Sequence, residues 1–435
     1  MRFSLPLLLP ASSSAYAQVP FVQDTIAYND LFNNRQSVVF DGKGFLHCAW
    51  SGQVGTNSAS REIYYATVAG DTVTSIPVTA NSVDDNYPTI AVDGADGVHI
   101  GFLGRDANNL FQVQYCRIEN GVPTAPVYIT AGGLNKATPW CVVGPDSVVH
   151  FLYYTFTTGP DTAYYRSYDL RTSSLSPEQA LTYAEVTGDF DGSLAVDTSG
   201  NVHCVVKSGG VSGGPLRYFT DRSGEITEVA TGIAVDVDYP RVLVDHANTV
   251  HILYRNSPEE VLYLTNDASG SFGTPVAITP PGQRPSTYHS FACDAMNRVY
   301  VVYQSSVATS GKGFYLIHGR DGVFSDTLRL FELSPDYILR NTSAVAARGD
   351  GEIALTYAPS ASRGGSVVCD IFLQHGIITT TGVTAAPHRP AFATLSQNFP
   401  NPFNPDTHIV YTTQAAGPRL AQDLRPSREE GYLAG

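Results

Sequence analysis

The chain repeats one pattern seven times, with a period near fifty residues. A histidine between apolar neighbours recurs in five copies, and Tyr or Ala takes its place in the last two: His47, His99, His150, His203, His251, Tyr300 and Ala354. Six positions earlier stands an aspartate or another turn residue: Asp41, Asp93, Gly144, Asp197, Asp245, Asp294 and Arg348. Repeats of this length form arrays of small units that pack on their neighbours. The chain is therefore expected to contain seven similar units.

Each copy reads as four strands. Residues 88–92 and 98–102 are apolar strands around the Gly- and Asp-rich turn 93–97. A third strand carries a tyrosine in six copies: Tyr65, Tyr115, Tyr165, Tyr218, Tyr263 and Tyr315. A Thr-rich fourth strand follows, as in residues 275–279. Four strands make one blade, so the sequence predicts an all-β fold, a seven-bladed β-propeller.

The N-terminus is expected to complete the last blade. The seventh copy has no good fourth strand after Phe372, whereas residues 24–28 read as a fourth strand with no third strand before them. If this segment supplies the outer strand of the last blade, the ring closes and loses its open sheet edge.

The net charge and the N-terminal segment limit the cellular compartments and the partners that are expected for this protein. The formal net charge is −14 and no Lys/Arg run occurs, so nucleic acid is not an expected partner. Residues 1–17 combine Arg2, an apolar run through Leu9 and small residues up to Ala17, and resemble a signal peptide cleaved before Gln18. No later apolar run is long enough for a membrane-spanning helix. The sequence predicts a secreted or outer-surface protein with its propeller at residues 18–377.

The C-terminal region carries a sorting motif. A linker at 378–394 precedes Leu395-Ser-Gln-Asn-Phe-Pro-Asn-Pro-Phe-Asn-Pro405 and the alternating residues 408–411. This closely resembles the opening of the C-terminal sorting domains of the type IX secretion system of Bacteroidetes, which are small β-sandwiches. The resemblance implies export across the outer membrane, the type IX machinery as a partner, and attachment to the cell surface. The tail from Gln414 is unlike the rest of such domains, so 395–435 is interpreted as a truncated sorting domain.

The repeated histidines and the six cysteines are interpreted as structural. Residues on both sides of each histidine position are apolar, and equivalent positions in a ring lie too far apart to share a metal. Each histidine is expected to hydrogen-bond within its blade, to the turn aspartate or to backbone. The cysteines fall on strands of six different blades without zinc-ligand spacing, and are expected to be buried thiols. No metal site is predicted.

A ligand is expected at the mouth of the central channel. The position six residues before the aspartate column reads Arg35, Tyr87, Thr138, Asp191, Tyr239, Tyr288 and Thr342. Tyrosine faces and polar groups suit a sugar, so Arg35, Tyr87, Asp191, Tyr239 and Tyr288 are the candidate ligand-binding residues. Nearby loops add Asp84, Asp85, Asp189, Asp236, Asp238, Arg284, His289 and Arg340. The segment 189–192 could hold calcium but lacks the other ligands of a known calcium loop, so no cofactor is expected.

The repeat region resembles sialidase-like propellers with BNR-type repeats, on its apolar strand, Asp turn, Val-His strand and Tyr strand. That resemblance implies the fold. Sialidases also carry complete Asp boxes, whereas turns here read Ala69-Gly-Asp-Thr-Val73, so the sialidase mechanism is not expected.

The sequence favours an exported, non-catalytic binding or scaffold propeller for a glycan or protein at the cell surface. One alternative is a polysaccharide lyase or glycoside hydrolase, with Tyr288, His289 and Arg284 as the catalytic candidates. Another is a purely structural surface protein.

Overall fold

The computed structural model divides the chain into two compact units. One unit is Gln18–Thr379, and the other combines Met1–Ala17 with Thr380–Gly435. The structure describes residues 17–18, 22–55, 57–70, 72–157, 161–182, 191–207, 214–234, 237–256, 259–283, 285, 289–305, 313–325, 327–332, 343–349, 351–379, 393–395 and 411–413. In the second unit these are the paired strands β35 (Ala393–Leu395) and β36 (Tyr411–Thr413). Residues 380–392 of the predicted linker, and nearly all of the predicted signal peptide and sorting motif, lie outside the described residues. The predicted linker begins too early, because Ile378 and Thr379 are the end of strand β34 and Ile378 is buried in the propeller core.

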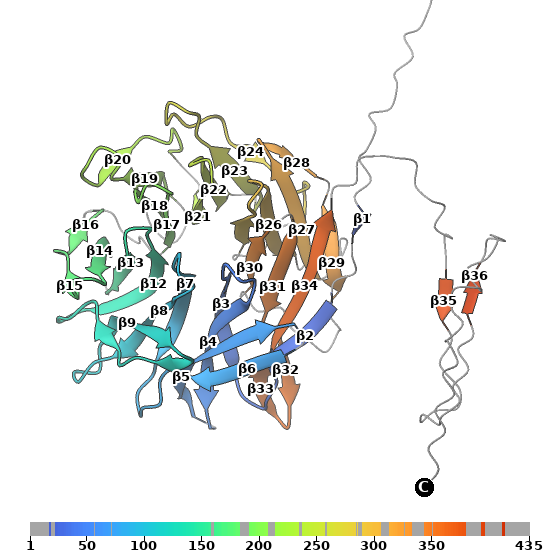
Figure 1. Ribbon diagram of the computed structural model, residues 1–435, viewed down its shortest axis with the longest axis horizontal. Helices are drawn as coiled ribbons and strands as arrows, with labels where there is room; N and C mark the ends of the chain where they lie inside the picture. Colours follow the sequence, from blue (N-terminus) through green and yellow to red (C-terminus); the bar gives the residue numbers. More distant parts are fainter. Residues whose placement is uncertain are drawn as a thin grey trace, which may run out of the picture. The chain divides into compact units, whose positions relative to one another are not determined.

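The larger unit is a seven-bladed propeller of antiparallel sheets arranged in a ring (Figure 1), as the sequence predicts. Blade 1 consists of β3 (Asn33–Phe40), β4 (Leu46–Val54), β5 (Asn57–Ala69) and β6 (Thr72–Pro77). Blade 2 consists of β7 (Asn86–Val92), β8 (Val98–Arg105), β9 (Phe111–Glu119), β10 (Val122–Pro123) and β11 (Val127–Tyr128). Blade 3 consists of β12 (Asn135–Val143), β13 (Val148–Phe156), β14 (Ala163–Asp169), β15 (Ser174–Leu175) and β16 (Gln179–Ala180), and blade 4 of β17 (Gly192–Val196), β18 (Val202–Lys207), β19 (Leu216–Thr220) and β20 (Thr227–Val229).

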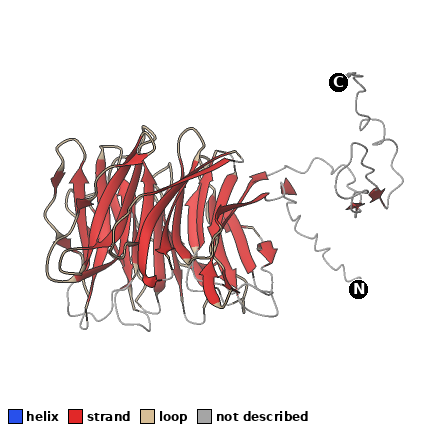
Figure 2. Ribbon diagram, turned by 90° about the horizontal axis from the view of Figure 1, so that it is seen from below, coloured by secondary structure: helices blue, strands red, loops and turns tan. Residues whose placement is uncertain are grey.

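Blade 5 consists of β21 (Asp238–Val244), β22 (Val250–Arg255), β23 (Val261–Thr265) and β24 (Val276–Ala277). Blade 6 consists of β25 (Ser290–Cys293), β26 (Val299–Ser305), β27 (Gly313–Arg320), β28 (Val323–Phe324) and β29 (Leu328–Glu332). Blade 7 consists of β30 (Ser343–Arg348), β31 (Glu352–Tyr357), β34 (Ile371–Thr379), β1 (Ala17–Gln18) and β2 (Val22–Ala27). The outer strand is in two pieces in blades 2, 3, 6 and 7, and the hairpin β32 (Ser360–Arg363) and β33 (Ser366–Cys369) is inserted in blade 7. The strands run between two faces where the loops gather (Figure 2). No helix in the described part of the chain is long and apolar enough to cross a membrane.

The N-terminal strand closes the ring, which confirms the prediction. Strand β2 pairs antiparallel with β34, with Val22 opposite His375 and Asp24 opposite Leu373. Its Ile26 and Ala27 side chains are buried with residues of blade 7 and blade 1. The contact continues beyond the strand, because Cys369 N–H donates to the Leu31 carbonyl at 3.1 Å. Blade 7 is therefore built from both ends of the propeller sequence.

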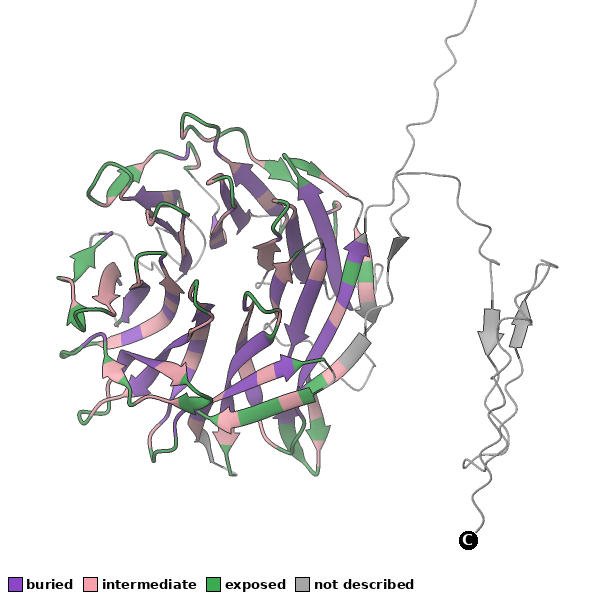
Figure 3. Cartoon of the chain, in the orientation of Figure 1, coloured by how far each residue is buried: buried purple, intermediate pink, exposed green. Residues whose placement is uncertain are grey.

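Neighbouring blades share their cores. Ala49, Ile63 and Tyr65 of blade 1 pack with Ile100 and Phe102 of blade 2. Ile100 directly follows His99, so an apolar residue beside the histidine takes part in the packing between blades. Burial is greatest on the inner and middle strands, while the outer strands expose one side (Figure 3). All six cysteines are free thiols and five are buried, as expected.

The repeated histidine bridges a turn aspartate and a tyrosine of the third strand. In blade 2, His99 Nε2 lies 3.1 Å from Asp93 Oδ2 and Nδ1 lies 2.7 Å from the Tyr115 hydroxyl. Blades 1, 4 and 5 repeat the tyrosine contact, and their Nε2 atoms lie 3.3 to 3.4 Å from the aspartate. The aspartate contact has hydrogen-bond geometry in blades 2 and 4, whereas in blades 1 and 5 it is a close approach of His47 and His251 to the carboxylate without that geometry. Because a carboxylate only accepts, Nε2 carries the proton and Nδ1 accepts from the tyrosine. The aspartate contact was predicted, whereas the tyrosine contact was not.

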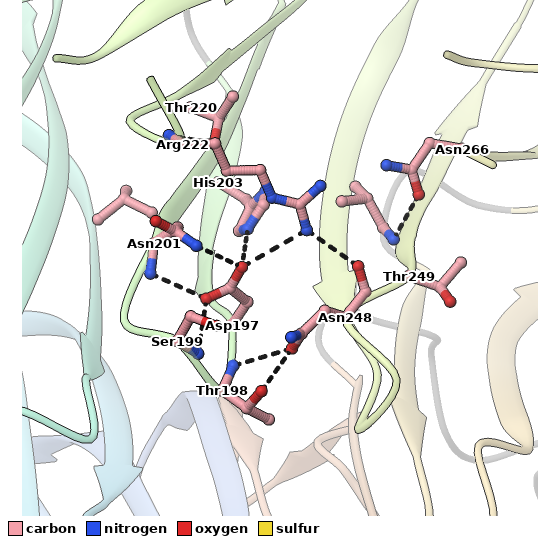
Figure 4. A network of polar contacts seen from close by, with 12 residues as sticks. Asp197, Thr198, Ser199, Asn201, His203, Thr220, Arg222, Asn248, Thr249 and Asn266 are labelled. Atoms are coloured by element: carbon pink, nitrogen blue, oxygen red, sulfur yellow. Dashed lines mark hydrogen bonds and ion pairs between the residues drawn. The ribbon is translucent and has the colours of Figure 1, made fainter. Parts of the chain in front are cut away.

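The aspartate also shapes the turn, as Figure 4 shows for blade 4. Asp197 Oδ1 accepts from the backbone N–H groups of Ser199 and Asn201, both at 2.9 Å, while Oδ2 faces His203. Burial alone would raise the pKa of Asp197, but hydrogen bonds from Asn201 and His203 outweigh it and hold that pKa below its usual value. Burial also lowers the pKa of His203 to about 4, so this histidine is neutral at pH 7.

Blade 3 lacks the aspartate and tests the network. Gly144 stands in its place, and His150 keeps its 2.7 Å contact with the Tyr165 hydroxyl while its buried Nε2 has no hydrogen-bond partner among the described residues. A Cβ on Gly144 would lie 3.1 Å from that nitrogen and 2.6 Å from a carboxylate oxygen of Asp146, whose flexible side chain can move.

We expect Gly144→Asp to raise the free energy of unfolding by about 1 kcal/mol, because it supplies the missing acceptor. Urea denaturation of this variant beside Gly144→Asn and Gly144→Ala measures the effect. Equal stability of the aspartate and alanine variants would contradict the role assigned to the carboxylate.

Candidate functional site

A central cavity of about 660 Å³ lies among the inner strands of the seven blades. Residues from β3, β7, β12, β17, β21, β25 and β30 all line it. These strands are antiparallel to their neighbours and alternate side chains between the two faces of each blade. A local departure from the regular strand can turn a further side chain toward the cavity.

A β-bulge provides that departure in four blades. The pairing with the second strand shifts between Asn34 and Ser37, and equivalent shifts occur in β7, β12 and β21. At each bulge one non-glycine residue has a positive φ: Arg35 58°, Tyr87 53°, Thr138 38° and Tyr239 49°. This conformation costs an L-residue about 1–2 kcal/mol. Strain repeated at one position suggests a functional constraint, and bulges commonly aim side chains at sites.

The bulges bring the sequence-predicted residues together. Arg35, Tyr87, Asp191 and Tyr239 all line the cavity, as does Thr138. The Arg35 guanidinium carbon lies 4.4 Å from the centroid of the Tyr87 ring, so cation and aromatic face are held together across two blades. Tyr288, Arg284, Thr342, Arg340, Asp189 and Asp236 lie outside the described residues.

Sequence reasoning missed two large side chains in the cavity wall. Trp140 and Arg241 occupy a column that is small in the other copies: Ser37, Thr89, Ser193, Ser290 and Ala344. In three copies this serine accepts a backbone N–H from the next blade, as Ser193 does from Val242 at 2.6 Å. The small residue thus joins blades, and its replacement by Trp and Arg was the signal that could have marked both residues.

Arg241 is the centre of the first polar group in the cavity. Its Nη1 donates to Asp191 Oδ1 at 2.8 Å, and its guanidinium carbon lies 5.2 Å from the Trp140 ring centroid. Both charged side chains are about 12% exposed. The ion pair and the indole face fix the guanidinium in one orientation without saturating its five donors.

A second polar group surrounds Asp238. Its two oxygens accept from Lys207 Nζ at 2.9 Å and Arg255 Nη2 at 2.7 Å. The Arg255 guanidinium carbon lies 5.3 Å from the Tyr239 ring centroid. Arg255 thus contacts both the Tyr239 ring and Asp238, and both oxygens of Asp238 are committed to positive charges.

His289 lies in the wall of the same cavity and is only 3% exposed. Neither ring nitrogen makes a hydrogen bond of good geometry with another described residue. Burial, with Arg241 and Arg255 nearby, lowers the pKa of His289 to about 3. At pH 7 the ring is neutral and is a very weak base.

The acidic residues singled out from the sequence have other partners here. Asp84 accepts from Arg61 Nε at 2.8 Å. Asp85 is buried, which raises its pKa to about 7. Among the described residues no group of three or more His, Cys, Asp or Glu side chains is placed to hold a metal ion. Asp191 of the segment considered for calcium is bound to Arg241.

No protein-family model matches the sequence, and no curated protein is significantly similar to it. Among solved structures, the chain is similar to a protein of unknown function from Dyadobacter fermentans, with 13% identity, a TM-score of 0.51, and coverage of 84% of this chain and 99% of the other. It is also similar to the intramolecular trans-sialidase from Ruminococcus gnavus, with 10% identity, a TM-score of 0.46, and coverage of 82% of this chain and 96% of the other. A third similar structure is AofleA from Arthrobotrys oligospora, with 11% identity, a TM-score of 0.47, and coverage of 74% of this chain and 94% of the other. At these identities the likeness concerns the propeller fold alone.

Proposed function

We propose that this protein is an exported binding module that holds a saccharide in its central cavity without cleaving it. The observation that carries the proposal is the set of four strained bulges at one repeat position. They direct different side chains, Arg35, Tyr87, Thr138 and Tyr239, into one cavity. A purely structural strand has no need for such strain in four blades.

The chemistry of the cavity suits a sugar. Tyr87, Tyr239 and Trp140 offer aromatic rings against which the C–H side of a sugar ring can pack. Arg241 and Asp191 are fixed in an ion pair and retain donors and acceptors for hydroxyl groups. A cavity with apolar walls and a few oriented polar groups is the usual form of a small-ligand site.

The polar groups favour binding over catalysis. Hydrolysis of a glycosidic bond needs a carboxylic acid that can donate a proton, and both carboxylates of the described cavity wall, Asp191 and Asp238, are ion-paired. A lyase needs a base near neutral pKa, whereas His289 has a pKa of about 3. These features support a module that retains its ligand.

The chain ends support a place outside the cell. The segment that resembles a signal peptide and the motif that resembles type IX sorting domains both favour export, with the type IX machinery as partner and the cell surface as destination. A surface glycan is then the ligand that such a module would meet.

The mature chain is expected to bind at least one glycan on a glycan array. Incubation with the bound glycans should release neither new reducing ends nor unsaturated products that absorb ultraviolet light. Trp140→Ala and Tyr239→Ala should each weaken the best hit at least about tenfold, because each removes an aromatic wall. Tyr128→Ala, on the exposed outer strand of blade 2, is the matched control and should bind normally. Product release would identify an enzyme instead, and an array without hits would exclude a glycan ligand.

A further inference from the structure

A second cavity, of about 260 Å³, lies at the seam where blade 7 meets blade 1. We call it the seam cavity. Its wall includes the aromatic residues Trp50 and Tyr64 and the polar residues Asn29, Asn33, Gln53 and Ser75, and no charged side chain is among its described lining residues. It shares no lining residue with the central cavity.

Trp50 brings an unused hydrogen-bond donor to this cavity. Its side chain is stacked on Tyr64, with ring centroids 5.6 Å apart and an interplanar angle of 18°, and Trp50 is 3% exposed. The buried indole Nε1–H has no hydrogen-bond partner among the described residues. A buried donor without an acceptor costs about 1–3 kcal/mol, so a missing acceptor is implied.

Other blades supply that acceptor from the chain. At the position of Trp50, blade 3 has Tyr153, whose hydroxyl donates to Glu178 Oε1 at 2.5 Å. Blade 6 has Tyr303, whose hydroxyl donates to Gln283. In both blades, the polar group of the residue at this repeat position therefore donates its hydrogen bond to a long acceptor side chain.

Blade 1 differs from blade 3 at two residues that explain the cavity. Ser75 and Glu178 each follow the column residue by 25 positions, but serine is too short to reach the indole. Asn33 stands opposite Gly52 as Lys136 stands opposite Thr155. In blade 3, the Lys136 ammonium lies 3.7 Å from Glu178 and 5.2 Å from the Tyr164 centroid, so an ion pair fills the place that is empty in blade 1.

Gly52 helps to keep the seam cavity in this form. A Cβ on Gly52 would lie 2.7 Å from the Tyr64 ring and 2.9 Å from Asn33 Oδ1. The absent side chain lets both groups lie close together in the cavity wall. The aromatic pair and the amide thus belong to one local arrangement.

We propose that the seam cavity binds one uncharged sugar unit, such as a neutral hexopyranose, as a site separate from the central cavity. A hydroxyl of the sugar accepts from the indole N–H and takes the part that Glu178 plays in blade 3. Asn33 Nδ2 already donates to Asn29 Oδ1 and to the Cys369 carbonyl. The groups left for the other hydroxyls of the sugar are therefore Asn33 Oδ1, Asn29 Nδ2 and the Ser75 hydroxyl. No cation is among the described lining residues, and the nearby Arg363 is already paired with Asp370, which disfavours acidic sugars.

The test uses the two tryptophans of the chain, Trp50 and Trp140, which line different cavities and give two indole N–H signals. The full mature chain labelled with ¹⁵N is titrated with the methyl glycosides of glucose, galactose, mannose, fucose and N-acetylglucosamine. At least one glycoside is expected to shift the Trp50 indole signal, and the shift should persist in Tyr239→Ala, which impairs only the central site. If none of the five shifts that signal, the seam proposal fails, whatever the central cavity binds.

Ser75→Glu rebuilds the blade 3 arrangement and is expected to weaken the glycoside at least about tenfold at Trp50 without lowering the melting temperature. Thr74→Glu, at the neighbouring exposed position of β6, is the matched control and should bind normally. A Trp50 shift unchanged in Ser75→Glu would overturn the proposal. Trp50→Phe, made in the Tyr239→Ala background, gives an independent check. Because this variant lacks the indole donor, saturation transfer from the protein to the glycoside should be lost. Saturation transfer that survives in this variant would exclude the site.

Discussion

Deleting residues 22–28 is expected to abolish cooperative folding of the propeller. The deletion removes β2, exposes the edge of β34, and takes Ile26 and Ala27 out of the core shared by blades 7 and 1. Burial of one isoleucine contributes about 1.5–3 kcal/mol, and the lost strand pairing adds to it. The total of about 5 kcal/mol approaches the entire stability of many domains. Circular dichroism and urea denaturation would show a missing or much weakened transition.

Point variants on the same strand separate closure from mere shortening of the chain. Ile26→Asp places a charge on the buried side and should reproduce most of the loss, while Thr25→Asp, on the exposed side, should cost less than about 1 kcal/mol. A synthetic peptide of residues 18–28 added to the deleted protein should restore the transition. A deletion variant as stable as the parent would show that β2 is dispensable.

The propeller is expected to lose stability as the pH falls from 6.5 to 4. Burial lowers the pKa of His150 and His203 to about 4 and that of His289 to about 3, and it lowers the pKa of His47 and His99 as well. The unfolded chain, with histidine near pH 6.5, takes up these protons first, so acid favours unfolding. Asp85, with a pKa raised to about 7, acts in the opposite direction, as do Asp161, Asp221 and Asp370, whose pKa burial also raises. Lowering one histidine pKa by 1 corresponds to about 1.4 kcal/mol, and the histidines with a lowered pKa outnumber the carboxyls with a raised one, so the net effect is a loss on the order of a few kcal/mol.

Urea denaturation at half-unit steps of pH would measure this loss as a falling free energy of unfolding. His203→Gln removes one titrating group and should reduce the slope between pH 6.5 and 4, although it lowers stability at pH 7. His246→Gln, which replaces a histidine outside the histidine column, is the matched control variant. A free energy that stays constant across this interval would show that the buried histidines do not resist protonation.

The sequence predicts the ring and its closure because both depend on patterns within one strand or at one repeat position. The Asp93 and His99 contact follows in the same way, since six residues and one turn separate them. The partner tyrosine is harder to assign, because the separation from histidine varies from 12 residues for Tyr263 to 18 for Tyr65. Loop length, which differs between blades, decides that separation.

Much of the candidate site is beyond such patterns. The rim position identified Arg35, Tyr87 and Tyr239, but their positive φ values arise from bulges set by pairing with the next strand. Arg241 and Trp140 lie in a column expected to be ordinary strand, and only their contact across blades shows their place in the cavity. The seam cavity exists because the short side chain of Ser75 leaves space beside Trp50. That space is recognised only when Ser75 is compared with Glu178, the equivalent residue of blade 3.

The shared last blade also sets the order in which the molecule can be finished. Asn33 donates to the Cys369 carbonyl, a partner 336 residues away in the sequence. Strand β2 therefore has no partner until β34, at the other end of the propeller sequence, is in place. Contacts over such distances form slowly. The ring is expected to close only after the other blades have formed, and its completion is then a late and single event.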